Sequence, residues 1–219
     1  NRKIIWTRDP KFIDYVLREN QRNYTKSDFA ISRASEFFGK GLVFSKGDYW
    51  RRQRRLIQPA FHRQKLMGLY GIMVKTIREV LVEIPTGKPI DIYPLMSKLS
   101  FKVLVNSLFD ISLSTELISE LNQLFNELQA FLLDESNRPY KKWFYPINRV
   151  EKKQYAKSER MRTILRNIIQ ERKASKNNYT DLLDMFLNST YEDTGEKMTE
   201  EQVIDEAFVM LFAGFETTS

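Results

Sequence analysis

Apolar residues recur at helical spacing along most of the chain. Asp9 followed by Pro10 and an apolar stripe predicts a short helix that ends near Asn20. After a loop-rich stretch, the periodic pattern predicts helices at residues 49–58, 63–83, 95–109, 115–135, 148–174 and 179–189, with a turn at 191–196. No internal repeat or low-complexity linker interrupts this pattern, so the sequence predicts one mainly α domain.

The last predicted helix begins at Thr199. Thr199 and Gln202 have the spacing of a capping box, in which each side chain binds the other residue's backbone N–H. From Val203 to Phe212 the helix is apolar nearly all round. A helix of this kind is expected in the centre of a protein.

Polar residues interrupt this apolar helix after Phe212. Gly214 lowers helix stability by roughly 1 kcal/mol relative to alanine, and the Thr217 hydroxyl can donate to the carbonyl of Ala213, four residues back. Two interpretations stay open from these residues alone. Either the helix ends here, or its loosened backbone forms a groove for a small polar ligand beside a source of protons.

A basic segment runs from Ser45 to Lys65, with seven Lys or Arg and one acid in a chain of net charge +7. Trp50 and Arg54 are four residues apart and share one helix face, where an indole N–H and a guanidinium can bind a carboxylate. Nucleic acid, anionic lipid, an acidic protein and a carboxylate-bearing cofactor are all candidate ligands of such a segment. The alternative is a solvated arginine face with Trp50 as a core anchor.

The amino-acid composition excludes several classes of protein and of metal site. The 219 residues are 42% hydrophobic and 29% charged, as in ordinary globular proteins. No cysteine is present and His62 is the single histidine, which excludes disulfides, thiolate zinc sites and multi-histidine metal sites. The apolar run at residues 207–215 is too short to span a bilayer. The chain starts at Asn1 in strand-like residues, which indicates a trimmed start and leaves open a preceding membrane anchor.

Two motifs, in this order, resemble those of the cytochrome P-450 family. The run Ala213-Gly214-Phe215-Glu216-Thr217-Thr218 resembles the family's oxygen-binding motif. The pair Trp50 and Arg54, followed by Pro59-Ala60-Phe61, is similar to the family's haem-carboxylate motif. The resemblance implies a mainly α cytochrome P-450 fold with a few short β-strands, of which residues 1–219 form the N-terminal part of a single incomplete domain.

The resemblance also implies site residues. It assigns Trp50 and Arg54 to the haem propionates, Ala213 and Gly214 to a haem-facing groove, Thr217 to the oxygen-activating hydroxyl and Glu216 to proton delivery. The apolar triplet after Gly39-Lys40-Gly41 is expected to reach the substrate pocket; it consists of Leu42, Val43 and Phe44.

The activity implied by the family is insertion of one oxygen atom of O2 into a small lipophilic substrate, such as a fatty acid or terpenoid. Haem is the expected cofactor, and the electrons come ultimately from NAD(P)H. An acidic redox partner, a ferredoxin or flavoprotein, is expected near Arg51, Arg52 and Arg55. No nucleic-acid partner and no membrane segment are expected in this chain, and a cytoplasmic location is favoured.

The sequence departs from the family in one large respect. The family's iron ligand is a cysteine in a C-terminal loop, whereas this chain has no cysteine and its last residue is Ser219. We therefore expect a fragment that is inactive alone, because the axial thiolate drives O–O cleavage. Two alternatives stay open: a non-enzymatic basic helical module that binds an anionic partner, and a truncated paralogue that regulates a full-length enzyme.

Overall fold

A computed structural model describes residues 5–109 and 113–218 of the chain. The helices are α1 (Pro10–Asp14), continued by a π-helical turn at Tyr15–Glu19, α2 (Asp28–Phe38), α3 (Gly47–Ile57), α4 (Arg63–Leu81), α5 (Ile92–Phe109), α6 (Thr115–Asn137), α7 (Tyr145–Asn148), α8 (Val150–Ala174), α9 (Leu182–Asn188) and α10 (Glu200–Thr218). Short 3₁₀ segments lie at Gln21–Asn23, Gln58–Phe61 and Pro139–Phe144.

The mainly α prediction is confirmed, but the few short strands are not seen in the described part of the chain. Paired extended backbone there is limited to one isolated antiparallel bridge between Thr190 and Lys197. A strand is stable only when a second extended segment pairs with its N–H and C=O groups. Ile5 and Trp6 are strongly exposed, and the strand-like residues before them lie outside the described residues.

Helix α2 was predicted as part of a loop-rich stretch, which is wrong. Its stability comes from distant residues: Phe37 and Phe38 are fully buried, and the Arg33 guanidinium donates to both carboxylate oxygens of Glu135 on α6, at 2.8 and 3.0 Å. Tertiary contacts of this kind override weak local periodicity. The short helices at residues 139–148 were likewise not predicted.

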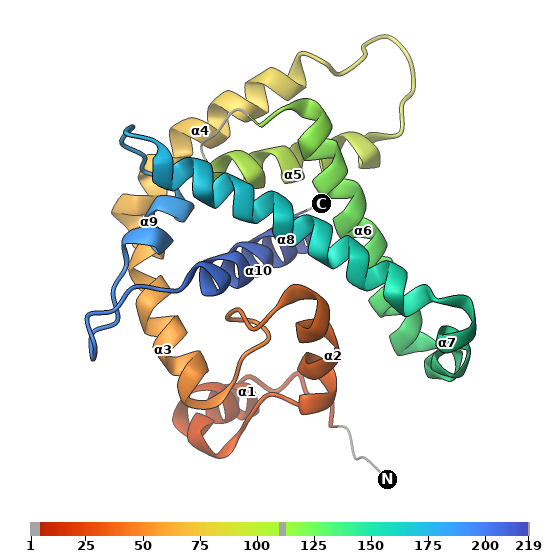
Figure 1. Ribbon diagram of the computed structural model, residues 1–219, viewed down its shortest axis with the longest axis vertical. Coiled ribbons are helices and arrows are strands. Elements are labelled where there is room, and N and C mark those ends of the chain that lie inside the picture. The colour runs from red at the N-terminus through yellow and green to blue at the C-terminus, as the bar shows by residue number, and fades with distance from the viewer. Residues whose placement is uncertain (1–4, 110–112, 219) are drawn as a thin grey trace.

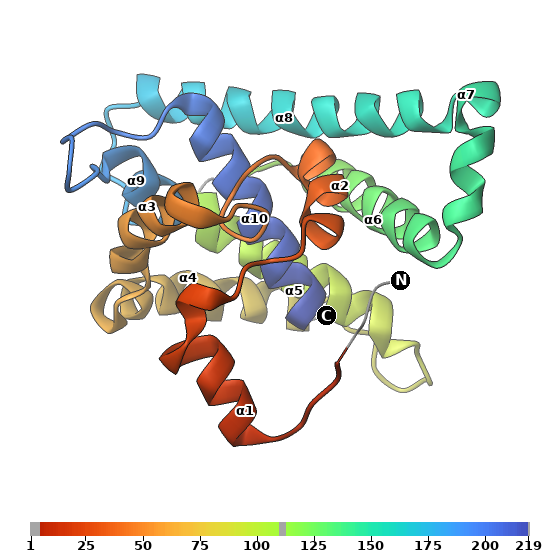
Figure 2. The same cartoon turned by 90° about the horizontal axis from the view of Figure 1, so that it is seen from below.

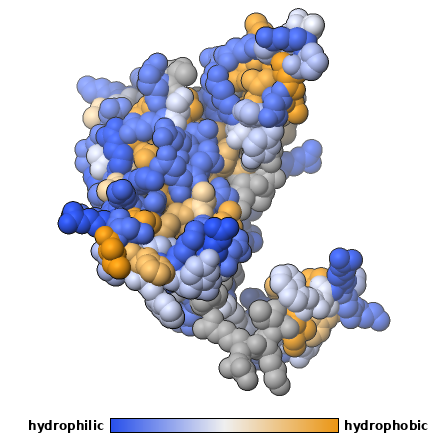
Figure 3. All heavy atoms as spheres, turned by 90° about the vertical axis from the view of Figure 1, so that its right-hand side faces the viewer, coloured by the Kyte–Doolittle hydropathy of each residue, from blue (hydrophilic) through white to orange (hydrophobic). Residues whose placement is uncertain are grey.

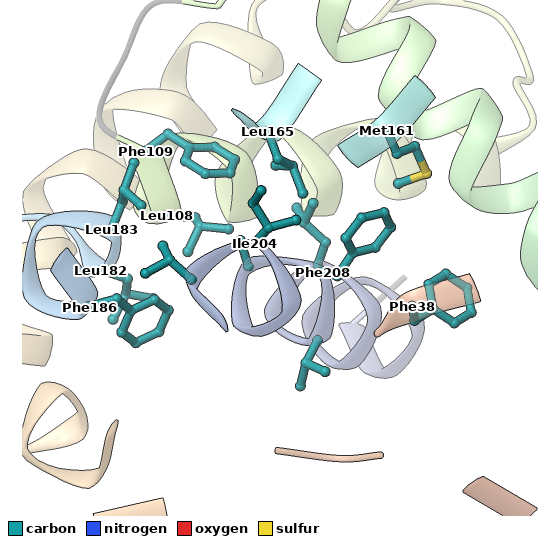
Figure 4. Packing of buried hydrophobic residues seen from close by; sticks show 14 of the residues in the cluster. Phe38, Leu108, Phe109, Met161, Leu165, Leu182, Leu183, Phe186, Ile204 and Phe208 are labelled. Carbon is teal, nitrogen blue, oxygen red and sulfur yellow. The ribbon is translucent and has the colours of Figure 1, made fainter. Parts of the chain in front are cut away.

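Helix α10 runs through the middle of the molecule, between α8 on one side and α5 on the other (Figures 1 and 2). Figure 4 shows Ile204 and Phe208 of α10 surrounded by side chains of the neighbouring helices. Both side chains are fully buried, as the all-round apolar pattern predicts.

The predicted start of α10 is confirmed at atomic detail. The Thr199 N–H donates to Gln202 Oε1 at 2.8 Å, and the Gln202 N–H donates to Thr199 Oγ1 at 3.3 Å. Both members of the capping box therefore bind each other's backbone. The cap fixes where α10 begins. It therefore also fixes which neighbouring helix or loop each later side chain of α10 faces.

The outer surface carries both hydrophobic and hydrophilic areas. On the face shown in Figure 3, hydrophobic patches lie between larger hydrophilic areas. Long helices α6 and α8 pack together and are joined by ion pairs such as Arg160 with Glu120, at 2.6 Å. Among the described residues, no helix is both long and apolar enough to cross a membrane.

Candidate functional site

A mainly apolar cavity of about 240 Å³ lies where the end of α3 faces α10. Its lining residues are Leu42, Arg54, Ile57, Gln58, Phe61 and Met210. Arg54 is the charged residue of this lining, and its side chain is exposed at the edge. The sequence motifs identified Leu42, Arg54 and Phe61. Ile57 and Met210 were missed, although Ile57 follows Arg54 by three residues and so shares its helix face.

A second cation stands near Arg54. Burial lowers the pKa of Lys26, and the nearby positive charge of Arg54 lowers it further, while Glu206 acts in the opposite direction. The Lys26 ammonium also lies 5.5 Å from the centre of the Trp50 ring. Trp50 is half-buried and does not line the cavity. Lys26, Trp50 and Arg54 therefore form a cationic edge beside the cavity, and Lys26 carried no motif that could have revealed it.

Helix α10 passes the cavity at Met210, one turn before Gly214. Ala213 and Gly214 are partly buried. A Cβ atom built on Gly214 would lie 2.7 Å from Leu104 Cδ1 of α5. The glycine therefore permits close packing of α5 and α10. The backbone of Glu216 and Thr217 belongs to α10, but their side chains lie outside the described residues.

Comparison with known proteins decides the family. The sequence profile described as cytochrome P-450 matches residues 1–219. The chain belongs to the cytochrome P-450 family. The recognition made from Trp50, Arg54 and the motif at residues 213–218 is thereby confirmed.

Relatives in the cytochrome P-450 family include monooxygenases from a bacterium and a plant. The chain is 28% identical to cyclooctat-9-en-7-ol 5-monooxygenase of Streptomyces melanosporofaciens, over 96% of the chain and 45% of that protein. It is 30% identical to echinocystic acid 23-monooxygenase of Saponaria officinalis, over 84% of the chain and 39% of that protein. The chain thus spans less than half the length of these relatives.

A solved cytochrome P-450 structure shares the fold. The haem domain of cytochrome P450DA superimposes with a TM-score of 0.80 at 21% identity, covering 95% of this chain and 46% of that one. At this identity the likeness shows the fold alone.

Only part of the predicted substrate triplet reaches the cavity. Leu42 lines it, whereas Phe44 is buried beside Phe38 and Phe212, with ring centres 5.9 and 5.4 Å away. Val43 is exposed. Residues 41–44 form a turn in which the Phe44 N–H donates to the Gly41 carbonyl at 2.9 Å, so the three consecutive side chains point in different directions.

The three arginines predicted to meet a redox partner differ in their surroundings. Arg52 pairs with Asp193 at 3.1 Å and stacks over the Tyr191 ring at 4.3 Å. Arg51 pairs with Asp48 on its own helix, at 3.1 Å. Arg55 is exposed. Arg52 is therefore engaged by the turn at residues 191–196.

The residues around the cavity fit a haem, the cytochrome P-450 cofactor. A haem combines a flat apolar ring with two carboxylates at one edge. The cavity offers apolar side chains from α3, the following 3₁₀ segment and α10. At its edge the Arg54 guanidinium can bind carboxylates, and the positive charge of Lys26 lies nearby. Within residues 5–109 and 113–218, no three His, Asp or Glu side chains cluster as a metal site.

A buried acid on α10 was not predicted from the sequence. Glu206 is 1% exposed, and burial raises its pKa to about 7. The negative charge of Asp205 adds to this increase, while the Leu42 N–H and Lys26 oppose it. A perturbed carboxyl group next to a cavity is typical of functional sites.

Proposed function

We propose that the complete protein is a haem-dependent monooxygenase that inserts one oxygen atom of O2 into a lipophilic organic substrate. One observation carries the proposal: a family member has an apolar cavity with a cationic edge between α3 and α10. Residues 1–219 are proposed to be part of one cytochrome P-450 domain. Electrons reach the site ultimately from NAD(P)H.

The chain's own residues are proposed to bind the haem and to exclude water from it. Arg54 and Trp50 are proposed to hold the haem carboxylates. The Lys26 ammonium adds positive charge nearby, while its donors bind the loop carbonyls of Leu42, Val43 and Ser45. Apolar side chains such as Ile57 and Met210 keep water from the ring. The bound haem supplies the redox chemistry that activates O2, and the protein tunes it.

Residues near the end of α10 are proposed to handle protons. Thr217 would hold a proton on its hydroxyl on the haem-facing side, and Glu216 would supply protons to that hydroxyl. Ala213 and Gly214 are proposed to face the haem with their small side chains. This assignment rests on the family resemblance, because α10 continues as α-helix through these positions and Gly214 packs against Leu104 of α5.

The substrate and the electron donor are also proposals. Leu42 and the apolar cavity favour a lipophilic substrate, in line with the lipophilic compounds in the names of two relatives. An acidic ferredoxin or flavoprotein is proposed to dock near Arg51, Arg52 and Arg55, with Arg51 and Arg52 contributing less because they are paired with Asp48 and Asp193. A cytoplasmic location is proposed.

The 219-residue chain alone is proposed to be inactive, because it contains no cysteine for the axial thiolate. The competing proposal of a basic module for an anionic partner predicts salt-sensitive binding of nucleic acid or anionic lipid without haem. Family membership favours the haem protein.

The test is haem retention by the complete protein after gel filtration. Arg54→Ala should lose at least half of its haem, because it removes a charge-assisted hydrogen bond worth about 1.5–3 kcal/mol. Arg55→Ala is the matched control, since Arg55 lies on the same helix, is exposed and does not line the cavity. Equal haem content in both variants would contradict the assignment of Arg54.

A further inference from the structure

The loop at residues 39–45 lies directly on α10, at distances that admit only glycine. Gly39 has a φ of +77°, and a Cβ there would lie 1.9 Å from Asp205 Oδ1. A Cβ on Gly41 would lie 2.6 Å from the Asp205 backbone oxygen and 2.6 Å from Val209 Cγ2. The two glycines therefore allow the loop backbone to touch the helix.

Adjacent acids of α10 bind alternate amides of this loop. The Lys40 N–H donates to Asp205 Oδ2 at 2.8 Å, and the Leu42 N–H donates to Glu206 Oε2 at 3.0 Å. Asp205 is itself held by an ion pair with Arg162 of α8. The side of the loop that faces α10 is thus fixed by two carboxylates.

A single ammonium group binds the carbonyl side of the same loop. Lys26 Nζ donates to the carbonyl oxygens of Leu42, Val43 and Ser45, at 2.8, 3.0 and 2.9 Å. An ammonium has three donors, and here all three are used. A shift of the loop would break several of these bonds together.

Glu206 carries a carboxyl group into the apolar interior, where it is 1% exposed. Its Oε1 is buried and has no hydrogen-bond partner among the described residues. Burying a carboxyl group with one unsatisfied oxygen is unfavourable. In the apolar part of α10 this carboxyl group provides one hydrogen bond, which it accepts from the Leu42 N–H.

Leu42 connects this bonding to the cavity. Its N–H and carbonyl are bound by Glu206 and Lys26, while its side chain lines the cavity together with Met210. Met210 follows Glu206 by one turn of α10. The loop and the helix therefore form one rigid wall.

We propose that Glu206 and Lys26 are positioning residues that hold Leu42 against the cavity and thereby shape the space left for a ligand beside the haem. The proposal rests on the proposed function for its cavity, and on the loop geometry for its mechanism. Neither side chain is proposed to touch the substrate.

The experiment uses the complete haem protein and two measurements. Glu206→Leu removes the acceptor for the Leu42 N–H. Glu200→Leu in the first turn of α10 is the matched control, because the Glu200 carboxylate pairs with Lys173 at 2.8 Å and not with the loop or with Arg162. Hydrogen exchange of residues 40–45 should accelerate about tenfold in Glu206→Leu, as expected for one lost buried hydrogen bond. Exchange in the control should match the wild type.

The second measurement is the difference spectrum with two probes. Binding of 4-phenylimidazole, whose phenyl ring needs the cavity wall, should weaken about tenfold in Glu206→Leu. Binding of imidazole, which is too small to need the wall, should change less than twofold. Glu206→Gln should restore both readouts, because its amide oxygen can accept the Leu42 N–H. Lys26→Met should change both readouts in the same way as Glu206→Leu. It replaces Glu206→Leu in both measurements if that variant does not fold.

Unchanged exchange at residues 40–45 in both Glu206→Leu and Lys26→Met would overturn the proposal. So would faster exchange with unchanged binding of 4-phenylimidazole, because the loop would then not shape the cavity. Absence of haem in the wild type would instead refute the proposed function. The exchange experiment needs no haem and would still test whether Glu206 and Lys26 hold the loop.

Discussion

Replacing Gly41 by alanine tests the close packing of the loop on α10. The added Cβ would lie 2.6 Å from two atoms, the Asp205 carbonyl oxygen and Val209 Cγ2, whereas ordinary van der Waals contacts begin near 3.4 Å. One of the two is backbone of the central helix, so relief requires the loop to move away. Overpacking of this kind costs about 1–3 kcal/mol. Displacement of the Leu42 N–H from Glu206 would add about 1 kcal/mol.

The assay is urea unfolding of the complete protein, followed by circular dichroism. We expect Gly41→Ala to lower the free energy of unfolding by about 2–4 kcal/mol, summing the two contributions. Gly68→Ala is the matched control, because Gly68 lies within α4 and a Cβ there meets no atom within 4 Å. The control should gain about 0.5–1 kcal/mol from its better helix propensity. Equal stability of the two variants would refute the loop geometry.

Two further predictions concern buried charge. Arg172→Met should lower the free energy of unfolding by about 3–5 kcal/mol, because it leaves the fully buried Asp181 unpaired; Arg160→Met, in an exposed pair with Glu120, should change it by less than about 1 kcal/mol in the same urea titration. The raised pKa of Glu206, about 7 against an ordinary 4.5, means that the folded protein binds more protons than the unfolded chain between these values. Stability should therefore fall as the pH rises through this window, by up to about 3 kcal/mol from this group. Glu206→Gln should remove that component, and superimposable pH profiles of the two proteins would contradict the raised pKa.

The sequence was most informative where structure depends on neighbours along the chain. Asp9 caps α1 through the Lys11 N–H at 3.0 Å, and Thr199 and Gln202 cap α10 as their spacing predicts. The apolar periodicity placed α4, α5, α6 and α8 within a few residues of their observed bounds. These signals are local, so no knowledge of the fold was needed to read them.

The sequence was least informative where contacts join distant residues. Leu42 and Glu206 are 164 positions apart, and Lys26 binds carbonyls 16 to 19 positions later. Neither Lys26 nor Glu206 belongs to a motif, and the adjacent acids Asp205 and Glu206 in the sequence of α10 give no indication of their partners. The family motifs identified Arg54 and Leu42 at the cavity, but Gly214 required the position of Leu104 to show its packing role.

The carbon monoxide spectrum of the reduced complete protein tests the central claim most directly. A haem with a thiolate ligand gives the family's characteristic red-shifted band, which we expect from the complete gene product and not from residues 1–219 alone, since that segment has no cysteine. A haem protein without this band, or a complete product that binds no haem, would contradict the proposed monooxygenase.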